Sequence, residues 1–272
     1  MPAFICAECG LQYPYSETPP ANCVVCQDDR WATLLPKPGW TTIGAMRANY
    51  RNAFRRHEPG LMGFATLPEF GGGQRALLLR TAQGNILWDC LSFLDEATIA
   101  IVTALGGVSA ISVSHPHHYG SMVEWSHAFD SAPIFLSASD RKFVARMDAA
   151  IRFWEEDTVE LVEGVTLLRC GGHFAGSTVL HWAQGGGGNG ALLTGDTIDI
   201  LPNGKVGFMR SHRNMIPLDA SSVSHIAETL LTLKFDTIYG STWDRVVGTN
   251  GAEVLAHSAR RYIDAVSAPP VG

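Results

Sequence analysis

Two separate groups of potential metal ligands stand out in the sequence. Four of the six cysteines form two C-x-x-C pairs, Cys6 with Cys9 and Cys23 with Cys26, and thirteen residues separate the pairs. Thiolates in two tight turns are the ligands of a closed tetrahedral zinc site. Iron in a rubredoxin-like site has the same ligands, and redox chemistry is a third alternative, although the βαβ context typical of it is missing. We expect a structural metal ion, with zinc as the first choice.

The second group consists of histidines and one carboxylate. The loop SHPHHYG carries His115, His117 and His118 directly after an alternating, strand-like run. His173 lies in the glycine-flanked turn GGHFAGS, and Asp196 follows another apolar run in LLTGDT. Imidazoles and a carboxylate at strand ends suit a divalent first-row metal. The residue types therefore predict a second metal site.

Four segments, taken in order, resemble the metallo-β-lactamase superfamily, which includes glyoxalase II and the lactamases. They are NILWDC, SHPHHYG in the place of the H-x-H-x-D-H box, GGHFAGS and LLTGDT, within roughly residues 61 to 243. The resemblance implies an α/β fold, a four-layer αββα sandwich with the metal at one edge between two sheets. It also implies that His115, His117, His173 and Asp196 are the metal ligands. The cysteine module lies outside that fold, and the combination resembles an uncharacterised branch of the superfamily.

The same comparison shows which ligands of the family are missing. Tyr119 and Gly120 stand where the family box has the Asp and His that hold a second metal. Ser241 stands where a further family His is expected near the end of a late strand. We therefore expect a mononuclear centre, with zinc as the first choice and iron or manganese as alternatives.

A single metal still activates water, but a side chain must then supply acid or base help. His118, Tyr119 and His212 are the candidates, and Asp196 is counted with them as a ligand in contact with the chemistry. For His118 we favour a role in the wall of the site over ligation. Asp89, at the end of NILWDC, is expected to orient the histidine loop by hydrogen bonds.

The elements that must position these residues alternate between strands and helices. Strands are expected at 76–80 and 86–89, which form a hairpin, and at 110–114, 134–136, 165–170, 178–182, 191–194 and 237–239. Helices are expected at 94–105, 121–129, 140–150, 222–233 and 252–266. We divide the chain into a cysteine module at 1–35, a connector at 36–60 and a metallo-β-lactamase-like domain at 61–272.

Composition limits the remaining functions. The 272 residues are 46% hydrophobic and 17% charged, which is typical of a folded domain. No apolar run reaches the roughly 20 residues of a membrane span, and the first residues do not resemble a signal peptide, so we expect a soluble, cytoplasmic protein. The net charge of −6 argues against nucleic acid as a partner. Cys90 and Cys170 lie in apolar runs and are expected to be buried thiols.

The leading hypothesis is a metal-dependent hydrolase of a small ester, thioester, lactone or amide. An alternative is an iron oxygenase in which His115, His173 and Asp196 form a two-histidine, one-carboxylate triad, as in the persulfide dioxygenases of the superfamily. A third is a non-catalytic scaffold held together by zinc. A small-molecule substrate is the expected partner, and the sequence leaves a homo-oligomer open.

Overall fold

The computed structural model describes residues 1–31 and 39–268, which divide into two compact units. Unit 1 comprises Met1–Glu155 and unit 2 comprises Glu156–Gly272. Within the described ranges, no helix combines the length and the apolar character needed to cross a membrane. The predicted end of the cysteine module, at residue 35, lies outside the described residues.

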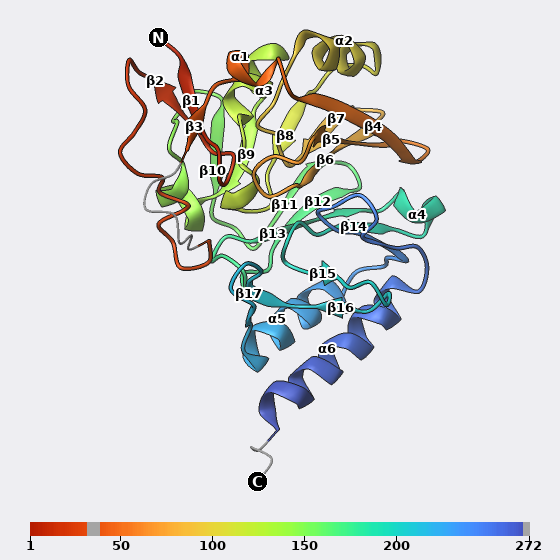
Figure 1. The fold of residues 1–272 in the computed structure, drawn as a ribbon. Helices are drawn as coiled ribbons and strands as arrows, with labels where there is room; N and C mark the ends of the chain where they lie inside the picture. The colour runs from red at the N-terminus through yellow and green to blue at the C-terminus, as the bar shows by residue number, and fades with distance from the viewer. Residues whose placement is uncertain (32–38, 269–272) are drawn as a thin grey trace. The chain divides into compact units, whose positions relative to one another are not determined.

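The cysteine module is built on a small antiparallel sheet at the start of unit 1 (Figure 1). Its strands, in the order β2-β1-β3, are β1 (Ala3–Cys6), β2 (Gln12–Tyr15) and β3 (Trp40–Thr41). Cys6 ends β1, and Cys9 lies in the turn that leads to β2. β3 comes from the stretch that the sequence predicted to be a connector, so part of that stretch completes the module's sheet.

A seven-stranded sheet forms the centre of unit 1, in the order β10-β9-β8-β7-β6-β5-β4. Its strands are β4 (Arg51–Glu58), β5 (Leu61–Leu67), β6 (Arg75–Thr81), β7 (Gly84–Trp88), β8 (Ala110–Ser112), β9 (Ile134–Ser137) and β10 (Ile151–Trp154). β4 to β7 are antiparallel, and β7 to β10 are parallel. The predicted hairpin (β6 and β7) and the predicted strands β8 and β9 are confirmed. The sheet also includes β4, which begins before the predicted domain start at residue 61.

Three helices accompany the sheets of unit 1, namely α1 (Ile43–Met46), α2 (Glu96–Ala104) and α3 (Met122–Ala128). Asp95 caps α2, since its Oδ1 accepts a hydrogen bond from the Thr98 N–H at 2.8 Å. α3 begins soon after the histidine loop, and its Trp125 ring stacks on Phe64 of β5 with 5.5 Å between centroids. The predicted helices at 94–105 and 121–129 are thus confirmed as α2 and α3.

The helix predicted at 140–150 is wrong. This segment contains only the end of a 3-10 helix, Ala138–Phe143, followed by turns. The reason is tertiary, because the side chain of Arg146 is buried and hydrogen-bonded to Gln12 and Glu124. Asp148 closes a local turn by accepting from the Ala150 N–H at 2.9 Å. These contacts outweigh the helical spacing of the apolar residues.

Unit 2 contains a six-stranded sheet in the order β11-β12-β13-β14-β19-β20. Its strands are β11 (Thr158–Val162), β12 (Val165–Arg169), β13 (Thr178–Trp182), β14 (Ala191–Leu193), β19 (Thr237–Tyr239) and β20 (Val246–Val247). The glycine run between β13 and β14 forms the short α4 (Gly185–Gly188). The four strands predicted in this part of the chain are confirmed as β12, β13, β14 and β19.

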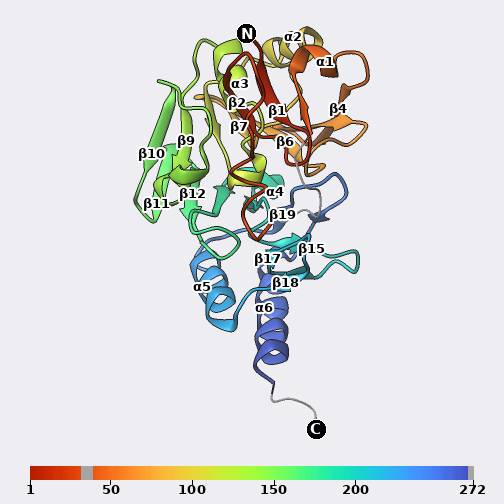
Figure 2. The ribbon, with the colours of Figure 1, turned by 60° about the vertical axis from the view of Figure 1, so that its left-hand side comes forward.

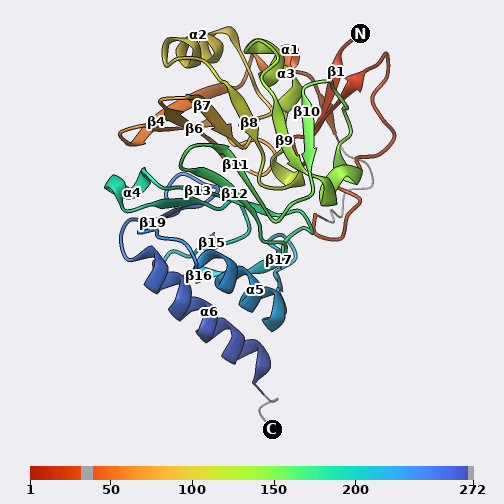
Figure 3. The same ribbon diagram turned by 180° about the vertical axis from the view of Figure 1, so that it is seen from behind.

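Two amphipathic helices, α5 (Ala220–Leu230) and α6 (Gly251–Ser267), pack side by side in unit 2 (Figure 3). Val223, Ile226 and Leu255 join strand residues such as Val179 and Ile238 in one buried core. Burial of these apolar side chains is the main force holding the helices on the sheet. The helices predicted at 222–233 and 252–266 are confirmed.

Two small hairpins lie between β14 and α5, where the sequence predicted only loops. They consist of β15 (Asp199–Ile200) with β16 (Val206–Gly207), and of β17 (Met209–Ser211) with β18 (Ile216–Pro217). Their strands are too short for periodicity to reveal them. They matter for function because they place Met209 and His212 near His173.

Candidate metal centre

The four cysteines of the amino-terminal module converge on one point. Cys6 Sγ lies 3.6 Å from Cys26 Sγ, and Cys9 Sγ lies 3.5 Å from Cys23 Sγ. All four sulfur atoms lie within 4.8 Å of one another and are buried. A tetrahedral ion with metal–sulfur bonds of 2.3 Å separates its ligands by about 3.8 Å, whereas a disulfide requires about 2.05 Å. The geometry therefore fits a four-thiolate metal site.

The thiols in this cluster influence one another's acidity. Hydrogen bonds from Cys26, Cys6 and Cys9 lower the pKa of Cys23. The hydrogen bond between Cys23 and Cys26 in turn raises the pKa of Cys26. The pKa of Cys6 is lowered as well, while burial raises that of Cys9. Burial also raises the pKa of Cys170 to about 12 and that of Cys90 well above its usual range. These two cysteines are buried thiols, as predicted.

Asp89 organises the histidine loop of unit 1 from the end of β7. Its Oδ1 accepts hydrogen bonds from the backbone N–H and the hydroxyl of Ser114, both at 2.8 Å. Its Oδ2 lies 3.0 Å from Nδ1 of His118. Asp89 has φ +63, a left-handed conformation that Asp tolerates better than most residues. The prediction that Asp89 orients the loop by hydrogen bonds is confirmed.

The loop itself is a buried 3-10 turn, Pro116–His118, which follows its N-cap residue His115, three residues after the end of β8. His115 and His117 are almost fully buried, and their rings meet edge to face with 5.2 Å between centroids. Nδ1 of His115 lies 2.8 Å from Ser114 Oγ, so its Nε2 is the nitrogen available to a metal. His118 uses Nδ1 to contact Asp89, which ties it to the loop's support.

Tyr119 and Gly120, which the sequence resemblance places at the family's second-metal ligand positions, are both enclosed. Tyr119 is 2% exposed, and burial together with nearby Asp140 raises its pKa well above the usual range, so the phenol stays protonated. Gly120 has φ +48, and a Cβ added there would lie 2.7 Å from the Cys90 carbonyl oxygen and 2.9 Å from the Leu91 carbonyl group. The backbone therefore has no room for any side chain at position 120.

Unit 2 carries the other two predicted ligands. His173 follows Gly171 and Gly172, whose φ values of +67 and +81 form the sharp turn after β12. Its Nδ1 lies 3.1 Å from the Met209 carbonyl oxygen, which leaves Nε2 as the ligand nitrogen. That Nε2 lies 4.0 Å from Asp196 Oδ2. Two ligand atoms of one tetrahedral ion are expected to lie about 3.4 Å apart, so the observed distance exceeds this by a few tenths of an ångström. His173 and Asp196 are thus neighbours within unit 2.

Comparison with known proteins identifies the fold. Residues 70–242 match the family model of the metallo-beta-lactamase superfamily. The chain belongs to this superfamily. It is also 41% identical over 270 residues to YmaE of Bacillus subtilis (strain 168), an uncharacterized protein, with 98% of each chain covered. The resemblance drawn from the four sequence motifs is confirmed.

Several solved structures share this fold at low sequence identity. The DIM-1 metallo-β-lactamase has a TM-score of 0.60 at 12% identity, covering 80% of this chain and 99% of its own. The mono-zinc form of FIM-1 from Pseudomonas aeruginosa has 0.55 at 14%, covering 77% and 95%. The di-iron-bound form of TTHA1623 has 0.52 at 20%, covering 71% and 96%. The predicted α/β metallo-β-lactamase fold is confirmed. The family match begins at residue 70, after the cysteine module.

His212, a predicted site residue of unit 2, lies beside His173, a predicted metal ligand. Its ring meets that of His173 edge to face, with centroids 5.3 Å apart. It also lines a pocket of about 220 Å³ together with Asp199, Phe208, Met209 and Met215. Burial raises the pKa of Asp199, an effect that the charge of His212 opposes. The pocket is mainly apolar and has a titratable pair at its edge.

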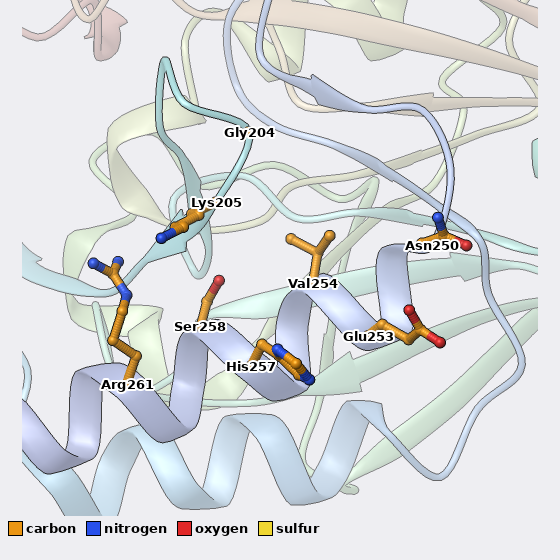
Figure 4. Close-up of a pocket in the computed structure, with 8 residues that line it drawn as sticks. All are labelled: Gly204, Lys205, Asn250, Glu253, Val254, His257, Ser258 and Arg261. Carbon is orange, nitrogen blue, oxygen red and sulfur yellow. The ribbon is translucent and has the colours of Figure 1, made fainter.

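A larger pocket of about 480 Å³ lies elsewhere in unit 2, along α6 (Figure 4). Figure 4 shows Lys205 and Arg261 near Ser258, while Glu253 and Asn250 lie toward the start of the helix. None of the predicted metal ligands lines it. Its polar side chains carry both signs of charge, so it gives no indication of a particular ligand.

Proposed function

We propose that the protein is a metal-dependent hydrolase with one divalent ion held by His115, His117, His173 and Asp196. The chain belongs to a superfamily whose fold is that of metal-dependent hydrolases, and all four residues lie inside the matched region. Zinc is the first choice of metal, with iron and manganese as alternatives that these donors also accept.

The observation that carries the proposal is the orientation of two imidazoles. His115 and His173 each have Nδ1 beside an oxygen, from Ser114 and Met209 respectively. A partner on one ring nitrogen sets the tautomer and the ring orientation so that the other nitrogen binds metal. Both His115 and His173 have this arrangement.

A single metal ion is supported by position 120. A second ion of the family type needs a histidine there, and the Cys90 and Leu91 backbone excludes even a Cβ. Bound at the proposed ligands, one divalent ion would polarise a substrate carbonyl and lower the pKa of a bound water to about 7. Proton transfer to the leaving group then falls to side chains of the protein.

We assign that role first to His212. Its ring touches His173 and forms part of the wall of the apolar pocket, and imidazole exchanges protons near neutral pH. Phe208, Met209 and Met215 suit the small acyl or alkyl part of an ester, thioester, lactone or amide. Tyr119 is the second candidate donor, because its phenol stays protonated.

Metal analysis and a substrate screen test the proposal. Esters, thioesters and lactones are offered to the zinc, manganese and iron forms, and we expect turnover with at least one form. His173→Ala should remove both turnover and the histidine-bound metal but leave the cysteine-bound metal in place. His212→Gln should lower kcat by about 10- to 1000-fold with unchanged metal content. The exposed His127, which pairs with Asp148, provides the matched control His127→Gln.

Other outcomes distinguish the alternatives. A coloured iron protein that consumes oxygen and hydrolyses nothing would favour the oxygenase. Absence of turnover with every metal would favour the scaffold. If Tyr119→Phe lowers kcat while His212→Gln does not, the proton donor is Tyr119 and the assignment to His212 is wrong.

A further inference from the structure

The cysteine module contacts the histidine loop directly, within unit 1. The backbone N–H of Gln12, the first residue of β2, donates to the Gly120 carbonyl at 3.1 Å. Gln12 follows the first cysteine turn, which is closed by the bonds Gly10 N–H to Cys6 O at 2.8 Å and Cys6 N–H to Leu11 O at 3.0 Å. The end of the histidine loop is therefore fixed to the first cysteine turn.

A buried polar network strengthens this attachment. Arg146 donates to Gln12 Oε1 at 2.5 Å and to Glu124 Oε1 at 2.7 Å, and the Tyr15 hydroxyl donates to the same Glu124 oxygen at 3.1 Å. Gln12 and Arg146 are buried. Figure 2 shows β2 close to α3, the helix that carries Glu124. The network thus joins the module to the helix that follows the histidine loop.

The second cysteine turn reaches a proposed metal ligand. Trp31, five residues after Cys26, lies against the ring of His117 with 4.6 Å between centroids and a 60° tilt. Trp31 is 5% exposed, and its backbone N–H donates a hydrogen bond to the Asp28 carbonyl at 3.0 Å. Its position therefore depends on the turn that contains Cys23 and Cys26.

A third contact joins the first cysteine turn, at Cys9 and Gly10, to neighbouring loops of unit 1. The Gly10 carbonyl accepts from the Ser92 hydroxyl at 2.8 Å, and the backbone of Cys9 lies 3.1 Å from the position that a Cβ on Gly71 would take. The module is consequently packed against the loops at 70–73 and 90–93 as well as against the histidine loop. Its place in unit 1 is fixed at three separate points.

We propose that the cysteine module is a positioning element for the histidine metal site: through Trp31 on His117 and Gln12 on Gly120, an ordered module holds the histidine loop ready to bind metal. A segment of about 30 residues cannot fold on apolar burial alone, so its order depends on the ion at the cysteines. Loss of that ion releases Trp31 and Gln12 from their contacts with the histidine loop. Metal binding must then order His117 itself, and the entropy cost of this ordering lowers the metal affinity. The inference rests on the proposed ligand role of His117.

The first test removes the Trp31 contact and leaves every ligand in place. Zinc affinity at the histidine site is measured by competition with a chromophoric chelator, with the cysteine site loaded. We expect Trp31→Leu to weaken binding by about 10- to 100-fold, the usual effect of losing a side chain that supports a ligand. Trp40→Leu is the matched control, because Trp40 lies in the same module but packs on Tyr13 at 5.2 Å. That control should change the affinity less than 2-fold.

The second readout is optical and independent of activity. Cobalt bound by His117 should quench the adjacent Trp31, so titration at the histidine site should lower tryptophan fluorescence in wild type and in Trp40→Leu. The part of this quenching that comes from Trp31 should be absent in Trp31→Leu. Cys23→Ser, which opens the cysteine site, should weaken zinc binding at the histidines as Trp31→Leu does.

The outcomes separate this inference from the proposed function. Wild-type protein that binds no metal at the histidines would overturn both. Wild-type binding with the same affinity in Trp31→Leu and Cys23→Ser would overturn only the positioning role and leave the hydrolase proposal standing. Equal losses in Trp31→Leu and Trp40→Leu would also overturn it, because general damage to the module would then explain the effect.

Discussion

Gly120→Ala adds only one methyl group, but we expect it to destabilise unit 1 severely. The glycine has φ +48, and the new Cβ would lie 2.7 Å from the Cys90 carbonyl oxygen and 2.9 Å from the carbonyl carbon and oxygen of Leu91. All three atoms belong to the backbone, so no side-chain rotation relieves the contact. The residues after β7 or the end of the histidine loop must move.

The magnitude follows from two contributions. A left-handed conformation costs an alanine about 1–2 kcal/mol relative to glycine. Forcing an extra carbon into a closely packed region costs about 1–3 kcal/mol more. We therefore expect Gly120→Ala to lower the free energy of unfolding by about 2–5 kcal/mol, a large part of the about 5–15 kcal/mol typical of a folded domain.

Urea denaturation followed by tryptophan fluorescence measures this loss, with an unchanged m value as the sign that only stability has changed. Gly107→Ala is the matched control in the same unit, because Gly107 has φ +71 and its added Cβ would meet only Phe129 Cδ1, at an ordinary 3.8 Å. The control should show the conformational cost alone. If both variants lose the same free energy, the contact with Cys90 and Leu91 is not limiting and the steric argument for a single metal fails.

Three further results are expected. Asp89→Asn keeps the left-handed backbone but removes the carboxylate beside His118, so zinc affinity at the histidines should fall about 10- to 100-fold in chelator competition; unchanged affinity would show that Asp89 does not support the site. The double change Cys6→Ser and Cys9→Ser should reduce the bound metal from two equivalents to one in elemental analysis, and two remaining equivalents would contradict the four-thiolate assignment. Asp219→Ala should lower the free energy of unfolding by about 1 kcal/mol, because Asp219 caps α5. Its hydrogen bonds lower its pKa, so this contribution is present above about pH 4 and is lost as the pH falls further; an equal loss at pH 3 and pH 7 would refute it.

Local sequence information was sufficient for the elements that carry the ligands. Strands such as β7, β8 and β14 are apolar runs that end at turn-forming or polar residues, so the sequence located both the strands and the residues at their ends. His115 and Asp196 could be placed at such strand ends for this reason. The cysteine cluster was equally accessible, because paired C-x-x-C turns have few structural uses.

The contacts around the histidine loop could not be predicted in the same way. Gln12 meets Gly120 and Arg146, and Trp31 meets His117, across separations of 86 to 134 residues with no spacing rule to connect them. The wrong helix at 140–150 has the same origin, since the buried bonds of Arg146 override local propensity. The glycine at position 120 allowed the sequence to predict that a second-metal ligand is missing. Only the structure shows that the backbone of Cys90 and Leu91 lies too close for a side chain at this position.

The glycine at position 120, where the sequence resemblance predicts a missing metal ligand, and the cysteine module share one arrangement of the backbone. The left-handed turn at Gly120 brings the chain against Cys90 and Leu91, which excludes a side chain, and the carbonyl of the same residue accepts the N–H of Gln12. A histidine at position 120 would have to move this residue and would thereby disturb the bond to β2. Under the one-metal proposal, the exclusion of a side chain at position 120 and the attachment of the module therefore depend on the same backbone turn. Under the positioning proposal, Trp31 and Gln12 then hold the histidine loop within unit 1.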